Sequence, residues 1–344
     1  MGPTVRIALD AMGGDHGPEE LIDGALLAVK QTDLHVTLVG NRQVLQARLD
    51  RLRSGDTGLL QRIQIVHASE VVEMSESPVD AIRKKKDASV LVAFDLVRQG
   101  KADAAVSAGN SGATMAAAVR KLGRMEHVSR PGIASIFPTL KKPVVMMDVG
   151  ANVDCRPQHL FQFAVMASAF SHIFDIDRPR IGILSIGEEI GKGNTLVKET
   201  YARLAASSLN FVGNVEGRDV FQGNVDVIVC DGFVGNICLK LSEGLAGAAM
   251  QMLKDEIMKS TAAKIGYFLA RPAFRSFAKR VDYAEYGGAP LLGINGIGII
   301  CHGKSSAEAI KNAILEAAKM VEKQVNQRIA AGLAEIALDE EAVV

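Results

Sequence analysis

Short apolar runs alternate along this chain with longer segments in which apolar residues recur at helical spacing. Several short runs, such as 63–66 and 225–230, are apolar almost throughout, which is typical of strands buried on both faces of a parallel sheet. The pattern predicts strands at 5–9, 35–39, 63–67, 102–107, 144–149, 180–186, 211–215, 225–230 and 297–301. Helices on both faces of a mainly parallel sheet follow from this alternation, so the predicted fold class is α/β.

Five of the predicted strands end in loops that combine glycine with Asp, Asn, Ser or Lys. The loops occupy residues 10–18, 107–114, 148–154, 187–195 and 231–236. Parallel sheets bind ligands where the carboxyl ends of their strands converge, so we expect the five loops to meet at one sheet edge. Backbone N–H groups in such loops can hold a phosphate or a carbonyl oxygen. Five independent structural turns are the alternative.

The first loop has the sequence DAMGGDHGP and begins at Asp10, directly after a predicted strand. Gly13 and Gly14 let the backbone approach an anion closely, and the helix that follows adds its positive N-terminal end. The loop matches neither GxGxxG nor GxxxxGKS/T, so neither a dinucleotide nor a nucleoside triphosphate is expected here. His16 is either a general base or a residue that orients the loop.

Three other loops carry candidate ligands and catalytic groups. Asn110 and Ser111 either contact phosphate or cap the helix that follows them. Lys192 lies between two glycines and either reaches an oxyanion or faces solvent. Asn236 either offers an amide to a carbonyl oxygen that becomes negative in a transition state, or caps a helix. We expect Asp231 to orient its loop rather than to act as a base.

The composition narrows the classes of function. Of 344 residues, 39 are Lys or Arg and 39 are Asp or Glu, so the net charge gives no reason to expect a nucleic-acid partner. The four cysteines lack metal-ligand spacing and no GxSxG or HExxH motif occurs, so we expect buried free thiols, no metal and no covalent nucleophile. No leader precedes the first strand and no apolar run approaches the ~20 residues of a membrane span. We therefore expect a cytoplasmic protein, either soluble or attached to a membrane surface.

The stretch 257–281 contains six Lys or Arg residues but no Asp or Glu. Its pattern is compatible with short amphipathic helices broken at Pro272. It fits a membrane-surface anchor, a dock for an acidic protein, or a helical hairpin that packs on the core or on a second subunit. The expected contact residues are Lys264, Phe268, Leu269, Arg271, Phe274, Arg275 and Phe277. A second basic cluster, 83–86, is expected to be a solvated helix end.

Six motifs occur in order along the chain: DAMGGDHGP, SAGNSGA, MDVGANVD, GEEIGKGN, CDGFVGN and YGGAPLLG. Together they closely resemble the motifs of the bacterial phosphate acyltransferases of phospholipid synthesis. The resemblance implies a three-layer α/β/α sandwich with a mainly parallel sheet, like that of isocitrate and isopropylmalate dehydrogenases, with a protruding helical hairpin. It also implies an enzyme that makes acyl phosphate from acyl-acyl carrier protein and inorganic phosphate without a cofactor.

The chain length fits one catalytic unit over residues 1–332, undivided or in two lobes, and the composition of the end of the chain predicts an acidic tail over 333–344. The resemblance implies a homodimer that associates with the inner face of the cell membrane, where a glycerol-3-phosphate acyltransferase acts downstream. Membrane or carrier protein then becomes the expected contact of 257–281. The cluster 83–86 is a second candidate for the acidic carrier.

These assignments predict direct attack of bound phosphate on the thioester carbonyl. Phosphate is already an anionic nucleophile at neutral pH, so the protein has only to orient it and stabilise the developing charge. Asn236 and Lys192 would stabilise the oxyanion, and Lys192 or a nearby acid would protonate the departing thiolate. The expected catalytic residues are Lys192, Asn236 and Asp231, and the expected binding residues are Asp10, Gly13, Gly14, His16, Ser107, Gly109, Asn110, Ser111, Gly112, Asp148, Asn152 and Gly232. The alternatives are transfer from acyl-coenzyme A, a dehydrogenase of the same fold, and a membrane-surface scaffold without activity.

Overall fold

A computed structural model of the chain describes residues 4–15, 17–52, 57–281 and 287–342. Within these residues one 11-stranded sheet has the order β3-β2-β1-β4-β11-β10-β5-β6-β9-β7-β8. The strands are β1 (Arg6–Asp10), β2 (His35–Gly40), β3 (Ile63–His67), β4 (Ala104–Ser107), β5 (Gly132–Phe137), β6 (Val144–Met147), β7 (Ile181–Leu184), β8 (Phe211–Val215), β9 (Val227–Val229), β10 (Ala289–Leu292) and β11 (Ile297–Ile300). All nine predicted strands are present, whereas the sequence pattern does not predict β5 and β10.

The two unpredicted strands reverse the direction of the sheet. Strands β3, β2, β1, β4 and β11 form a parallel first half, and β6, β9, β7 and β8 form a parallel second half. Between them, β11/β10, β10/β5 and β5/β6 are all antiparallel pairs. Three successive reversals leave the two halves pointing in opposite directions. The expectation that all five polar loops meet at one sheet edge is therefore wrong, because the loops divide between opposite edges.

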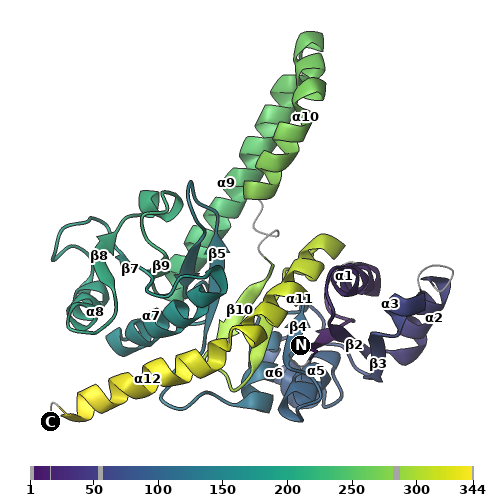
Figure 1. Cartoon of the computed structure of the whole chain (residues 1–344), viewed down its shortest axis with the longest axis horizontal. Helices are drawn as coiled ribbons and strands as arrows, with labels where there is room; N and C mark the ends of the chain where they lie inside the picture. The colour runs from purple at the N-terminus through teal and green to yellow at the C-terminus, as the bar shows by residue number, and fades with distance from the viewer. Residues whose placement is uncertain (1–3, 16, 53–56, 282–286, 343–344) are drawn as a thin grey trace.

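Helices cover both faces of the sheet (Figure 1). Ile7 and Leu9 of β1 point into the layer that contains α1 and α11, whereas Ala8 points toward α5 on the other face. This alternation confirms the three-layer α/β/α sandwich. The helices of the body are α1 (Pro18–Gln31), α2 (Arg42–Leu52), α3 (Thr57–Leu60), α4 (Pro78–Lys84), α5 (Ser89–Arg98), α6 (Ser111–Leu122), α7 (Pro157–Ser171), α8 (Thr195–Ala205), α11 (Ala307–Glu322) and α12 (Val325–Ala342), with 3-10 turns at His172–Phe174 and Gly217–Phe221.

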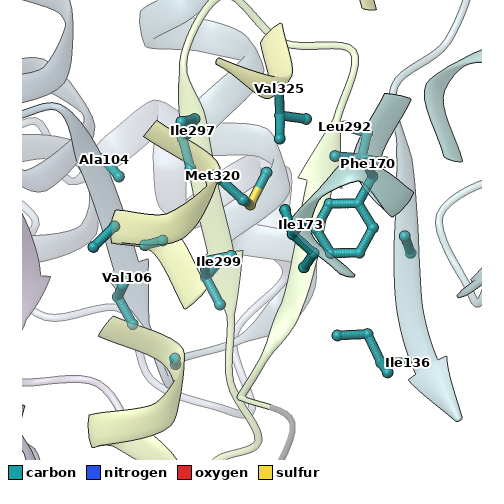
Figure 2. Packing of buried hydrophobic residues seen from close by; sticks show 14 of the residues in the cluster. Ala104, Val106, Ile136, Phe170, Ile173, Leu292, Ile297, Ile299, Met320 and Val325 are labelled. Atoms are coloured by element: carbon teal, nitrogen blue, oxygen red, sulfur yellow. The ribbon is translucent and has the colours of Figure 1, made fainter. Parts of the chain in front are cut away.

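One hydrophobic core joins the two halves of the sheet. Figure 2 shows Val106 of β4, Ile299 of β11 and Phe170 of α7 in one cluster. Phe170 lies beside Leu292 of β10. Ile136 of β5 continues the same cluster, which extends into the second half of the sheet. The antiparallel centre is thus buried and fixes how the two halves face each other.

The expected helical hairpin projects from the body as α9 (Gly232–Met258) and α10 (Thr261–Val281), the green helices at the top of Figure 1. Its first arm comes from a segment that was not expected to belong to it. The predicted break at Pro272 is wrong, because this residue lies inside α10. The segment expected as an acidic tail is helical as far as Ala342, at the end of α12. In the described part of the chain, no helix has the length and apolar character to cross a membrane.

Candidate functional site

A buried carboxyl group braces the first two polar loops. Ser107 Oγ donates a hydrogen bond to Asp10 Oδ2 over 2.8 Å, and the Met12 N–H donates to Asp10 Oδ1 over 3.3 Å. The Gly109 N–H donates to Ser107 Oγ over 3.2 Å. Burial raises the pKa of Asp10, although the hydrogen bonds that it accepts oppose the shift. Ser107, which was expected to bind phosphate, therefore donates to the protein's own carboxyl group.

The same two loops touch each other at Gly13. A Cβ atom at this position would lie 2.7 Å from the backbone nitrogen and 2.9 Å from the Cα atom of Gly109, so no side chain fits. Gly14 has a φ angle of 101°, which glycine adopts readily and other residues rarely do. Both glycines serve the contact between the loops. His16, the remaining candidate in the first loop, lies outside the described residues.

The second loop continues as the start of α6. Asn110 Oδ1 accepts a hydrogen bond from the α6 backbone over 3.0 Å, so Asn110 is the helix cap that the sequence allowed as an alternative. Its amide donates to the carbonyl oxygens of Met74 and Glu76 over 3.0 and 3.2 Å. A Cβ atom on Gly112 would lie 2.8 Å from the proline at the start of α4. Of the candidates in this loop, Ser111 faces the cleft that lies over the centre of the sheet.

A second buried carboxyl group, Asp148, organises the loop after β6. It accepts five hydrogen bonds of 2.7–3.3 Å, from the N–H groups of Ile133, Gly150, Ala151 and Asn152 and from the Asn152 amide. Burial raises the pKa of Asp148, and these bonds act in the opposite direction. The side chain is fully buried. Asp148 and Asn152 thus fix the conformation of the loop from its buried side.

The loop after β9 joins this arrangement through α9. Asp231 Oδ1 accepts hydrogen bonds from the second and third N–H groups of α9 over 3.0 and 2.9 Å, which is the orienting role expected for it. The Gly232 N–H donates to the carbonyl oxygen of Asn152 over 2.7 Å. The third and fifth polar loops therefore form one unit.

Asn236 is the candidate that this unit presents to the cleft. Its side chain packs beside Gly150, where Asn236 Oδ1 would lie 3.5 Å from a Cβ atom built on the glycine. The Asn236 amide is exposed and has no hydrogen-bond partner among the described residues. It does not cap α9, because Asp231 does. The amide is free to bind a ligand.

Lys192 lies apart from this group, in the loop after β7. Its side chain is exposed and runs over Gly187, where Lys192 Cγ would lie 3.2 Å from a Cβ atom. The loop is held by Asn214, whose amide donates to the carbonyl oxygen of Glu189 over 2.9 Å. The structure therefore brings Ser111 and Asn236 together in one cleft but leaves Lys192 outside it.

The cleft has a volume of about 430 Å³ and lies over β5. Strand β5 has six residues, and a strand of five or six residues spans roughly 17–20 Å. Groups from opposite edges of the sheet can therefore line one cleft along β5. The lining residues are Ser111, Ile133, Ser135, Ile136, Val149, Gly150, Asn236, Leu239, Lys240, Glu243, Gly287, Gly288, Ala289, Ile300, Cys301, His302, Lys304, Ser305 and Ser306.

Four of these lining residues come from a loop that was not predicted to belong to the site. His302, Lys304, Ser305 and Ser306 follow β11. A signal was present, since a predicted strand at 297–301 is followed by glycine, lysine and serine. This is the same composition as in the five loops that were selected.

The thiols are poorly suited to nucleophilic attack. Burial raises the pKa of the Cys301 thiol in the cleft wall, and it raises that of Cys155 to about 11. All four cysteines are free; Cys230 and Cys301 are buried as expected, whereas Cys155 and Cys238 are half-buried. Among the residues that the structure describes, no three His, Cys, Asp or Glu side chains are grouped to hold a metal ion.

Apolar and cationic side chains are exposed together on the hairpin. Phe268 and Leu269 are 70% and 75% exposed, and Phe277 is 51% exposed. Phe274 is half-buried and packs against Tyr267, with ring centroids 5.0 Å apart. The three exposed cations among the predicted contact residues are Lys264, Arg271 and Arg275. Exposed apolar side chains that lie close together are a typical feature of interaction surfaces.

Known proteins of similar sequence identify the family of this chain. A family model described as "Fatty acid synthesis protein" matches residues 5–328. A protein from Nitratidesulfovibrio vulgaris (strain DP4) named phosphate acyltransferase is 54% identical over 331 residues, which cover 96% of this chain and 94% of that protein. This chain belongs to the phosphate acyltransferase family. A further phosphate acyltransferase, from Geotalea uraniireducens, is 55% identical over 332 residues, with 96% and 95% of the two chains covered.

Membership of the phosphate acyltransferase family makes this chain an enzyme of acyl transfer to or from phosphate. The solved structure of a phosphotransacetylase from Streptococcus pyogenes has a TM-score of 0.63 at 18% identity and covers 94% of this chain and 95% of its own. A 4-hydroxythreonine-4-phosphate dehydrogenase from Klebsiella pneumoniae has a TM-score of 0.54 at 15% identity, with coverages of 93% and 100%. At these identities the likeness concerns the fold alone.

Proposed function

We propose that this phosphate acyltransferase moves a fatty acyl group from acyl-acyl carrier protein to inorganic phosphate and releases acyl phosphate for phospholipid synthesis. The family provides the reaction class, and the donor and the product are the proposal. The observation that carries it is the free amide of Asn236 in the same cleft as Ser111. An unpaired amide beside a glycine backbone is suited to an oxygen that gains charge during a reaction.

In the proposed reaction, an oxygen of the bound phosphate attacks the carbonyl carbon of the thioester. The carbonyl oxygen becomes negative, and the Asn236 amide donates a hydrogen bond to it. The carbon–sulfur bond then breaks, and the thiolate takes up a proton to give the free thiol of the carrier and acyl phosphate. Lys192 lies outside this cleft, so its predicted role as second oxyanion contact and proton donor requires its loop to reach the cleft when substrate binds. No enzyme nucleophile is needed, which agrees with the raised pKa of the Cys301 thiol.

The buried carboxyl groups have a positioning role in this proposal. Asp10 holds the loop that leads to Ser111, and Asp148 holds the loop that leads to Gly150. Asp10 accepts from its own loop and from Ser107, and Asp148 accepts from its own loop and from β5, so the loops keep their shape before substrate binds. Fixed geometry of this kind lowers the entropic cost of bringing phosphate and thioester together.

The test compares thioester donors. We would measure thiol release from acyl-acyl carrier protein, acyl-coenzyme A and an acyl-pantetheine thioester, each with and without phosphate. The proposal predicts phosphate-dependent release that is fastest with the carrier protein. Equal or faster release from acyl-coenzyme A would favour that donor instead. A rise in Tm with a nicotinamide cofactor or Mg²⁺, together with no phosphate-dependent release, would favour a dehydrogenase.

We further propose that the hairpin attaches a homodimer to the inner face of the cell membrane, where a membrane-bound glycerol-3-phosphate acyltransferase would take the product. Support comes from Phe268 and Leu269 beside Lys264 and Arg271, because apolar residues enter the lipid boundary while cations meet anionic headgroups. The carrier protein and the second subunit are the alternative occupants of this surface. The protein would then be cytoplasmic and peripheral to the membrane.

A further inference from the structure

The loop after β11 carries a lysine into the cleft and is held in place by hydrogen bonds within the loop and to the first polar loop. The Asp15 N–H donates to the carbonyl oxygen of Gly303 over 2.7 Å, which ties this loop to the first polar loop. The Lys304 N–H donates to His302 Nδ1 over 3.1 Å, and the Ser305 N–H donates to the carbonyl oxygen of His302 over 2.9 Å. The Lys304 side chain itself is exposed in the cleft.

Lys304 gives the cleft a positive charge that its neighbours do not cancel. The other charged residues in the lining, Lys240 and Glu243, pair with each other over 3.0 Å. Lys304 pairs with no carboxylate in the described ranges of the chain. Behind the cleft wall, Glu316 accepts a hydrogen bond from the Gly288 N–H over 3.0 Å. Burial raises the pKa of Glu316 well above its ordinary value, which favours the neutral form of this carboxyl group.

Hydroxyl groups accompany this charge. Ser111 and Ser305 line the same cleft, and the hydroxyl of neither is engaged in a hydrogen bond within the described structure. A lysine acts on phosphate as a mobile point charge, and hydroxyl groups donate hydrogen bonds to the phosphate oxygens. We propose that Lys304, Ser111 and Ser305 form an anion subsite that binds a phosphate group taking part in the acyl transfer.

Two substrates of the proposed reaction could supply this group. One is the inorganic phosphate that attacks the thioester. The other is the phosphodiester of the phosphopantetheine group through which the carrier protein holds the thioester. Both present tetrahedral phosphate oxygens to Lys304. The subsite rests on the proposed function for its role, whereas its affinity for phosphate can be measured without any turnover.

The binding test uses the Lys304→Gln variant, which keeps a polar side chain but removes the charge. Because Lys304 is exposed, the substitution leaves the core unchanged. We would follow Tm as inorganic phosphate is added at constant ionic strength. Loss of a charge-assisted contact is expected to raise the half-saturating phosphate concentration about 10-fold or more. Lys30→Gln, at an exposed position near the end of α1, is the matched control and should respond like the wild type.

The kinetic test identifies the source of the phosphate group. A rise of about 10-fold or more in KM for phosphate alone would assign the subsite to inorganic phosphate. A rise in KM for the thioester alone would assign it to the phosphodiester of the carrier arm, and either result supports the subsite. Equal Tm responses of the wild type and Lys304→Gln, together with unchanged KM values, would overturn it. Because the Tm measurement needs no turnover, failure of the proposed reaction would not be mistaken for failure of the subsite.

Discussion

Gly235 lies where α9 meets the loop of Asp148, and it offers a direct test of how Asn236 is positioned. A Cβ atom at residue 235 would lie 2.9 Å from the carbonyl carbon of Asp148 and would overlap the carbonyl oxygen. It would also lie 3.0 Å from Cys230 Sγ. The backbone at Asp148 cannot move aside freely, because the side-chain carboxyl group of Asp148 accepts five hydrogen bonds. We therefore expect Gly235→Ala to push α9 away and to displace Asn236.

The size of the effect follows from two opposing contributions. Alanine is favoured over glycine inside a helix by about 1 kcal/mol, while overpacking a tight contact costs about 1–3 kcal/mol. The clash at Gly235 is with backbone, so its cost belongs at the upper end and the net loss of stability is about 2 kcal/mol. Gly247 lies on the same helix, and a Cβ atom added there would meet no neighbouring atom of the described residues within 4 Å. Gly247→Ala should therefore stabilise the protein by about 0.5–1 kcal/mol.

The assay combines urea unfolding with the rate of phosphate-dependent thiol release. Gly235→Ala should lower the urea midpoint and slow turnover, whereas Gly247→Ala should raise the midpoint and leave turnover unchanged. A Gly235→Ala variant with the stability and turnover of the wild type would refute the close contact between α9 and the Asp148 loop. The positioning of Asn236 would then need another explanation.

Three further predictions concern the site, its pH dependence and the hairpin. Asn236→Ala and Lys192→Ala should each lower kcat by about 10² or more, as loss of an oxyanion contact does; near-wild-type turnover by a folded variant removes that residue from the mechanism. Burial raises the pKa of Glu316 in the folded protein, whereas the unfolded chain releases this proton at the ordinary pKa of glutamate. Between these two pKa values, the wild type loses up to about 1.4 kcal/mol of stability per pH unit as the pH rises. The Tm of Glu316→Gln relative to wild type should therefore rise between pH 5 and pH 8, and a constant difference would contradict this. Charge reversal at Lys264 and Arg271 should weaken binding to anionic vesicles while turnover on soluble donor stays nearly intact. An equal loss of turnover would indicate that these residues bind the carrier protein or hold the dimer together.

The sequence predicts the strands that are buried on both faces, because such strands are apolar almost throughout. It does not predict the central antiparallel strands. β10 has four residues and contains Pro290, whose nitrogen cannot donate a hydrogen bond. Its strand conformation depends on pairing with β11 and β5, which lie close to it only in the folded protein. The direction of half the sheet depends on β5 and β10, neither of which was predicted, so the reversal of the sheet was not predicted either.

The candidate site was predictable in part, for a chemical reason. Glycine-rich loops with free N–H groups bind any anion, and a carboxylate of the same chain competes with a ligand for those groups. In this protein Asp10 and Asp148 accept hydrogen bonds from N–H groups of their loops. The sequence alone cannot distinguish a loop that binds its own carboxylate from a loop that binds phosphate. Ser111 and Asn236 were recognised because helix starts after glycine loops are natural ligand positions. Lys304 was missed because its loop was not compared with the other five.

The proposed reaction has acyl phosphate as its product. The most direct test is a mass-spectrometric search for acyl phosphate after the purified protein has been mixed with acyl-acyl carrier protein and inorganic phosphate, with Asn236→Ala in parallel. We expect acyl phosphate and free carrier thiol in equal amounts with the wild type, and at least about 10²-fold slower formation with the variant. Loss of the acyl thioester without acyl phosphate, or no loss at all in the presence of phosphate, would contradict the claim.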